Sequence, residues 1–160
     1  MNRFTHTIAP VFNEESRILI LGSFPSPKSR EVGFYYGHPQ NRFWSVLSVV
    51  LNEPCPKTPE EKQMLLFKHH IALWDVLHSC DISGASDSSI KNPVPNDLQR
   101  IFDVADIRAV FTTGKTAGKL FKRFTGCESV ILPSPSPANC AVSFDQLTEA
   151  YRCILPYLTD

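Results

Sequence analysis

Four short apolar segments, separated by segments with helical spacing, constrain the fold of this chain most strongly. They are RILILG (17–22), IALWDV (71–76), IRAVFTT (107–113) and SVIL (129–132). Continuous short apolar runs are typical of strands that are buried on both faces of a parallel sheet. Strands that alternate with helices predict an α/β fold with helices on both faces of that sheet. Because 160 residues suit one core, we predict a single domain over residues 1–160.

The intervening segments carry apolar side chains at helical spacing. The expected buried faces are Phe43, Leu47, Val50 and Leu51; Leu98, Ile101, Phe102 and Ala105; Ala117, Leu120, Phe121 and Phe124; and Leu147, Tyr151, Ile154 and Leu158. TPEE (58–61) predicts a capping box between Thr58 and Glu61, and SFDQ (143–146) predicts another. Asn96 is expected to cap the helix that follows it.

Composition excludes several classes of protein. Hydrophobic residues make up 42% of the chain and charged residues 20%, which indicates a folded protein rather than a disordered one. The net charge of zero does not indicate a nucleic-acid partner, although a neutral protein can still carry a local basic patch. Five cysteines without CxxC spacing favour reduced thiols, a cytoplasmic location and no zinc site. No apolar run approaches the roughly 18 residues that span a membrane, so we expect no membrane partner and no secretion signal. We also expect the protein to be a monomer.

Three loops leave the carboxyl ends of the predicted strands: 22–41, 77–95 and 133–142. Ligands of open parallel sheets bind at this edge. The first two loops are long for connections without structure of their own, and such loops are usually functional. We therefore expect the site where the three loops converge.

The segment TTGKTAG (112–118) superficially resembles a phosphate-binding loop. That motif needs a glycine five positions before the Gly-Lys pair, but Ala109 stands there, inside the predicted strand. We instead expect Gly114 to turn the chain into a helix. The basic residues of this helix either form a solvated face or meet DNA phosphates: Lys115, Lys119, Lys122 and Arg123.

Two loops combine serines with prolines. GSFPSPKS (22–29) is either a tight loop with capping serines or a loop whose amides and hydroxyls approach a phosphate or a base. LPSPSPAN (132–139) repeats this chemistry after the fourth strand, and its three prolines predict a stiff loop. Two such loops at one sheet edge favour the second interpretation.

Three segments together resemble one family. LILGSFPSPKSREVGFYYGHPQNRFWSVL (19–47) closely resembles the first motif of the hypoxanthine-DNA glycosylases, family six of the uracil-DNA glycosylase superfamily. LPSPSPAN resembles their second motif, and residues 74–97 resemble their middle segment. The resemblance implies a three-layer α/β/α sandwich on a four-stranded parallel sheet. It also implies excision of deaminated bases from DNA without a metal or cofactor.

The chain departs from the wider superfamily at two positions. Elsewhere the first motif carries Asn or Asp two residues after its opening glycine, to position water, and Phe24 stands there in this chain. Elsewhere the second motif starts with His or Asn, and here Leu132 takes that position. Family six shares these absences and uses a later asparagine, which corresponds to Asn41.

The resemblance implies two catalytic residues, Asn41 and His38. Asn41 would hold the attacking water, although a helix N-cap is its structural alternative. His38 would donate to the base or leaving group, or it would only shape the turn. The rival water-activating groups are Asp75, Asp81 and Asp87, of which Asp87 is the first to test.

A flipped base would contact several of these residues. Tyr36 would stack on the base, whereas at least one of Phe34, Tyr35 and Tyr36 belongs to the core. The other expected base contacts are Gly22, Ser23, Phe24 and Ser26. The expected DNA contacts are the loop residues Ser134, Ser136, Pro137 and Ala138, which would enter the minor groove, together with Lys115 and Arg42.

The predicted function is hydrolysis of the N-glycosidic bond of hypoxanthine in DNA, with uracil and xanthine as further substrates. One alternative is a non-catalytic nucleic-acid-binding module on the same fold. A serine hydrolase is a second alternative, but the chain contains no G-x-S-x-G sequence.

Overall fold

The computed structural model describes residues 2–159. Its main sheet has four parallel strands in the order β3-β2-β6-β7. The strands are β2 (Ile18–Gly22), β3 (Ile71–Asp75), β6 (Ala109–Thr113) and β7 (Val130–Leu132). All four predicted strands are therefore present, and their parallel pairing brings their carboxyl ends to one edge.

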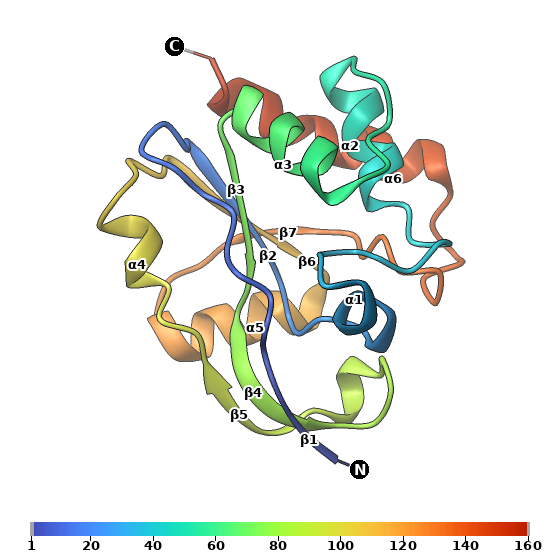
Figure 1. Cartoon of the computed structure of the whole chain (residues 1–160), viewed down its shortest axis with the longest axis vertical. Helices are drawn as coiled ribbons and strands as arrows, with labels where there is room; N and C mark the ends of the chain where they lie inside the picture. Colours follow the sequence, from blue (N-terminus) through green and yellow to red (C-terminus); the bar gives the residue numbers. More distant parts are fainter. Residues whose placement is uncertain (1, 160) are drawn as a thin grey trace.

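Helices cover both faces of this sheet, which confirms the predicted three-layer fold (Figure 1). On one side lie α2 (Phe43–Leu51), α3 (Pro59–Lys68) and α6 (Phe144–Tyr151). On the other side α5 (Lys115–Thr125) packs on β6 and β7, with the short α4 (Gln99–Phe102) nearby. Gly114, with φ 105°, turns the chain into α5 as expected.

A second sheet was not predicted. It is antiparallel, in the order β1-β4-β5, and consists of β1 (Asn2–Thr5), β4 (Leu77–Ile82) and β5 (Lys91–Pro95). The segment expected to be an irregular loop after β3 is therefore mostly strand, with the 3-10 turn η1 (Asp87–Ser89) between β4 and β5. β5 shows no hydrophobic pattern in the sequence, because most of its side chains are exposed. The loop after β2 likewise contains a helix, α1 (Pro27–Val32).

The predicted helix caps are only partly correct. Ser143 and Gln146 form the expected capping box. Thr58 caps α3, but the Glu61 carboxylate accepts the backbone N–H of Lys57 at 3.0 Å and closes no capping box. Asn96 is not a cap, because α4 starts at Gln99. The last helix changes at Arg152 into the 3-10 segment η2 (Arg152–Tyr157), which contains Pro156.

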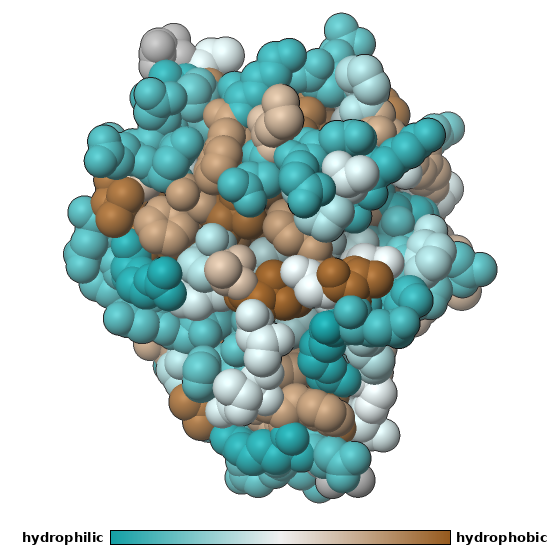
Figure 2. All heavy atoms as spheres, viewed as in Figure 1, coloured by the Kyte–Doolittle hydropathy of each residue, from teal (hydrophilic) through white to brown (hydrophobic). Residues whose placement is uncertain are grey.

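The core is continuous across the layers. Four residues of β2, Ile18 to Leu21, have no exposed surface, and they belong to one cluster with apolar side chains of α2, α5 and α6. Figure 2 shows a mainly hydrophilic face, with hydrophobic residues in its central part. Within residues 2–159, no helix is both long enough and apolar enough to cross a membrane.

Candidate active site

A cavity of about 870 Å³ lies at the carboxyl ends of the parallel strands. The three loops expected to converge all contribute to its lining, and the turn from β6 into α5 adds a fourth side. The polar and aromatic lining residues include Ser23, Ser26, Tyr36, Asn41, Asp75, Asp87, Thr113, Lys115, Ser134, Ser136 and Asn139.

Gly22 ends β2 and lines the cavity. A Cβ atom at this position would collide with Oδ1 of Asp75 and would lie 3.3 Å from the Tyr36 hydroxyl. Close approach of these polar groups therefore requires a glycine here. As a result, the ends of β2 and β3 and the Tyr36 side chain border a single small region of the cavity.

Tyr36 is an aromatic lining residue of the cavity. Its ring stacks on Phe43, with ring centroids 4.0 Å apart and an interplanar angle of 13°. Its hydroxyl makes a 2.9 Å hydrogen bond with Oγ1 of Thr113. Burial, reinforced by the negative charge of Asp75, raises the pKa of Tyr36 well above 10.0, so the phenol stays neutral. Its two aromatic neighbours, Phe34 and Tyr35, are buried in the core, as expected for at least one of the three.

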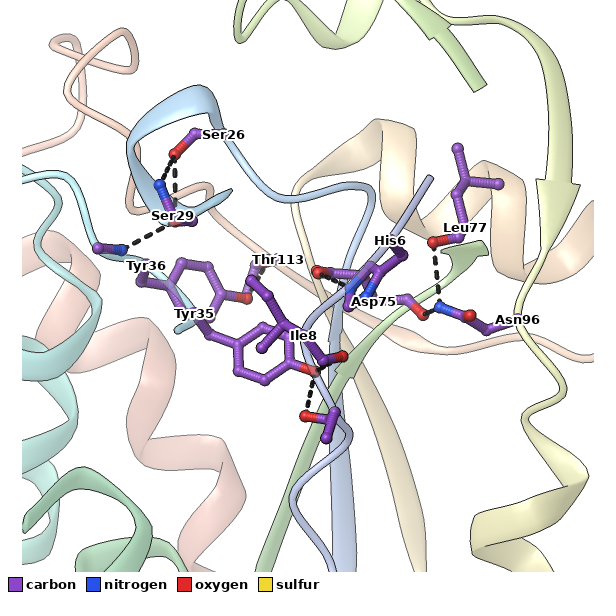
Figure 3. A network of polar contacts seen from close by, with 12 residues as sticks. His6, Ile8, Ser26, Ser29, Tyr35, Tyr36, Asp75, Leu77, Asn96 and Thr113 are labelled. Carbon is purple, nitrogen blue, oxygen red and sulfur yellow. Dashed lines mark hydrogen bonds and ion pairs between the residues drawn. The ribbon is translucent and has the colours of Figure 1, made fainter. Parts of the chain in front are cut away.

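A serine network holds the segment that carries Tyr36. Ser26 caps α1 by accepting the backbone N–H of Ser29, and the hydroxyl of Ser29 accepts the N–H of Gly37 at 2.9 Å. Figure 3 shows this network beside Tyr36. The Ser26 hydroxyl lines the cavity, but its hydrogen bonds go to α1.

Asn41 both lines the cavity and supports the start of α2. Its Oδ1 accepts the backbone N–H of Phe43 at 2.9 Å, and its own N–H donates to the carbonyl of His38. The residue at the N-cap is Arg42, whose side chain makes no capping bond. Asn41 therefore stands one position before the N-cap, supports the first turn of α2 with its side chain, and lines the cavity.

His38 does not reach the cavity. Its side chain is exposed, its Nδ1 accepts the N–H of Gln40 at 3.1 Å, and it is not a lining residue. This geometry supports the turn-shaping alternative for His38 rather than the catalytic one.

Arg42 binds the backbone of the protein itself. Its guanidinium donates to three backbone carbonyls, those of Val142 at 2.6 Å, Asn139 at 3.0 Å and Ser136 at 3.2 Å. Its backbone N–H donates to Pro135. These bonds order the loop that follows β7, and a contact of Arg42 with DNA stays a prediction.

We call residues 133–142, the loop after β7, the finger loop. The hydroxyls of Ser134 and Ser136 each accept a backbone N–H from two residues further on. Asn139 donates to the carbonyl of Ser134 at 3.0 Å, so the loop is cross-linked internally. Pro137 and Ala138 are exposed at its tip, whereas Ser134, Ser136 and Ala138 line the cavity.

A buried His–Asp pair at the cavity wall was not predicted. Nε2 of His6 lies 2.9 Å from Oδ2 of Asp75, and both residues are buried. Figure 3 shows Asn96 next to this pair, where its amide donates to the carbonyls of Asp75 and Leu77. No sequence signal marks His6, because it is an isolated histidine far from every motif.

The other two aspartates behave differently. Asp87 lines the cavity, and its Oδ1 accepts the hydroxyl of Ser23 at 2.9 Å. Asp81 lies away from the cavity and pairs with Arg3; a hydrogen bond from Asn92 contributes most to lowering its pKa. Only two of the three rival carboxylates, Asp75 and Asp87, therefore remain.

Basic residues are sparse around the cavity. Lys115 is exposed at the start of α5 and lines the cavity, and Lys119 is exposed one turn later. Lys28 instead pairs with Glu31, and Arg30 lies over the ring of Phe4 at 4.0 Å. Within residues 2–159, no three His, Cys, Asp or Glu side chains are grouped so that they could hold a metal ion.

The fold and the cavity define a three-layer α/β protein with a polar ligand site at the carboxyl ends of its strands. More particularly, the chain belongs to the uracil DNA glycosylase superfamily, whose family model matches residues 9–155. A hypoxanthine DNA glycosylase of Methanosarcina acetivorans is 35% identical over 143 residues, which cover 87% of this chain and 90% of the relative. A hypoxanthine DNA glycosylase of Methanosarcina barkeri is 35% identical over 134 residues, covering 81% and 85%.

A solved structure supports the same fold. The solution NMR structure of a candidate uracil DNA glycosylase from Methanosarcina acetivorans superposes with a TM-score of 0.77 at 30% identity. The match covers 94% of this chain and 98% of that one.

Proposed function

We propose that this chain is a DNA glycosylase that excises hypoxanthine. The observation that carries the proposal is that Tyr36 and Asn41, both from the first motif, line one cavity at the carboxyl ends of the strands. Two relatives that match more than four-fifths of the chain bear the name hypoxanthine DNA glycosylase. Uracil and xanthine are further candidate bases. The core is continuous, and we propose that the chain acts as one domain and as a monomer.

The base must leave the DNA stack before it can react. Flipping costs a few kcal/mol and is cheapest for a mispaired base, as deaminated bases are. The free face of Tyr36 then offers stacking worth about 1–3 kcal/mol per base. The exposed tip of the finger loop, Pro137 and Ala138, would fill the gap that the base leaves, and Lys115 would meet a phosphate.

Cleavage of the glycosidic bond places positive charge on the sugar and negative charge on the base. Within residues 2–159, the backbone N–H groups of Ser23 and Phe24 donate no hydrogen bond to the protein, so they are free to donate to the leaving base. Asn41 would hold the attacking water through its side-chain oxygen. A strong base is not needed, because an oxocarbenium-like sugar is highly electrophilic.

The test is an excision assay on oligonucleotides that carry one hypoxanthine, uracil or xanthine, followed by alkaline cleavage of abasic sites. We expect cleavage at hypoxanthine, in the presence of a chelator as well as in its absence. Tight binding of the hypoxanthine oligonucleotide without cleavage would instead support a non-catalytic DNA-binding module. Activity lost to the chelator and restored by zinc or magnesium would contradict the metal-free mechanism.

A further inference from the structure

Two carboxylates border the cavity, and their surroundings differ. Asp75, at the end of β3, has the buried ring of His6 2.9 Å from its Oδ2. Asp87, on η1, receives only the neutral hydroxyl of Ser23, and within residues 2–159 it forms no ion pair. When two carboxylates share one site and only one of them has a basic partner, the other is suited to hold a proton and to donate it.

The groups that face Asp87 strengthen this contrast. They are Asp75, Tyr36 and Cys80 of β4, whereas Lys115 of α5 lines the same cavity but makes no ion pair with Asp87 among residues 2–159. Burial raises the pKa of Asp87 above 3.8, and the charge of Asp75 raises it further, whereas the hydrogen bond from Ser23 opposes the shift. The acid form of Asp87 therefore persists to a higher pH than that of an exposed aspartate.

We propose that Asp87 is a further catalytic residue, a general acid that donates its proton to a ring nitrogen of the departing purine. This inference rests on the proposed excision of hypoxanthine. Hypoxanthine offers N3 and N7 as acceptors that stay uncharged until the glycosidic bond lengthens. Ser23 holds Oδ1 of Asp87, which leaves Oδ2 to carry the proton toward the base.

Cleavage of the glycosidic bond is coupled to the proton transfer. The C1′–N9 bond breaks, and its electron pair moves to N9 and into the purine ring. The proton of Asp87 passes to N7 or N3, so the purine leaves neutral and Asp87 becomes a carboxylate. Water adds to C1′ and gives up one proton, which restores the acid form of Asp87. The free N–H groups of Ser23 and Phe24 supplement this transfer, because both reduce the negative charge on the leaving base.

The test compares single-turnover excision of hypoxanthine by the unmodified protein and by Asp87→Asn over a range of pH. Asparagine has the size of aspartate and keeps an oxygen for the Ser23 hydroxyl, but it cannot donate an acidic proton. We expect Asp87→Asn to be about 10²-fold slower, in line with the loss of a general acid. We also expect the unmodified rate to fall as pH rises through the pKa of Asp87, and this fall to be absent in the variant.

Substrate analogues provide a measurement that would not change if Asp87 had only a structural role. Oligonucleotides with 7-deazahypoxanthine or 3-deazahypoxanthine lack one of the two candidate acceptors. The unmodified protein should lose its advantage over Asp87→Asn on one analogue and keep it on the other. An equal effect of the substitution on hypoxanthine and on both analogues, or a parental rate in Asp87→Asn, would overturn the assignment.

Two controls show whether Asp87→Asn is slow because it is unfolded or because it lacks the proton donor. Melting of Asp87→Asn shows whether the variant is folded, and Asp87→Glu keeps an acid that should recover part of the rate and restore the pH dependence. If Asp87→Glu is no faster than Asp87→Asn although it is folded and binds the oligonucleotide, the proton-donor role is wrong. If the unmodified protein excises no hypoxanthine, the proposed function fails first.

Discussion

Asn41 and Phe43 are joined by a hydrogen bond, in which the Asn41 side-chain oxygen accepts the Phe43 backbone N–H at 2.9 Å. The bond supports the first turn of α2, while Asn41 also lines the cavity. A carbonyl oxygen has two acceptor positions, so one is left for the O–H of a water. A structural role and a catalytic role are therefore compatible in one side chain.

Asn41→Ala should lower both the excision rate and the stability. Loss of a well-placed polar group of this kind costs on the order of 10²–10³ in rate, by analogy with a lost oxyanion donor. Loss of a side-chain cap costs about 1 kcal/mol of the free energy of unfolding. The measurements are single-turnover excision of hypoxanthine and thermal melting. A variant that melts at a lower temperature but cleaves at the parental rate would show that Asn41 only supports the start of α2.

Asn41→Asp is the matched control for this substitution. Aspartate supports a helix start about as well as asparagine and suits its positive end, so stability should stay near the parental value. The rate should still change, because a carboxylate would face the water and the leaving anion. A parental rate and pH profile in Asn41→Asp would count against a catalytic Asn41.

Arg42→Lys should loosen the finger loop without changing the salt dependence of DNA binding. A lysine cannot reach three carbonyls with fixed geometry, and each charge-assisted bond contributes about 1.5–3 kcal/mol, non-additively. We expect a lower melting temperature and slower excision from duplex DNA. The slope of log affinity against log salt should stay constant, whereas the control Lys115→Gln should reduce it by about 0.9. If Arg42→Lys and Lys115→Gln changed the slope equally, Arg42 would contact a DNA phosphate.

Tyr36→Phe and Tyr36→Ala should separate stacking from hydrogen bonding. Phenylalanine keeps the ring on Phe43 and loses only the bond to Thr113, at about 1 kcal/mol of stability. Alanine removes the stacking surface and should weaken binding of the flipped base by about 1–3 kcal/mol. Binding is measured with an oligonucleotide that carries a non-hydrolysable hypoxanthine nucleotide. Equal affinity in the two variants would mean that no base stacks on Tyr36.

Asp87→Asn should raise thermal stability at neutral pH. The folded pKa of Asp87 is raised, so this side chain favours the folded state below the unfolded pKa and disfavours it as pH rises through the folded pKa. The substitution removes that unfavourable charging, and its benefit should shrink as pH falls below about 4, where the acid becomes protonated in both states. Melting curves across this range test the sign, and a variant that is less stable at neutral pH would contradict it.

Much of the fold and part of the site can be predicted from local patterns. The strands around Ile20 and Phe111 are recognisable because burial on both faces demands a continuous apolar run. The loops at their carboxyl ends follow from the parallel order, and the first motif places Tyr36 and Asn41 among them. The segment 77–95 has no comparable signal, because β4 pairs with β1 and β5 in a separate antiparallel sheet and most side chains of β5 are exposed.

Local sequence patterns are enough to predict the parallel sheet, its helical layers and the edge at which the cavity opens. The hydrogen-bond partners of Arg42, His6 and Asp87 follow only from the folded structure. Arg42 lies 100 positions from Val142, and His6 lies 69 positions from Asp75. Hydrophobic periodicity is a local consequence of burial, whereas the partner of a polar side chain depends on which distant backbone or carboxylate the folded chain brings within hydrogen-bonding distance.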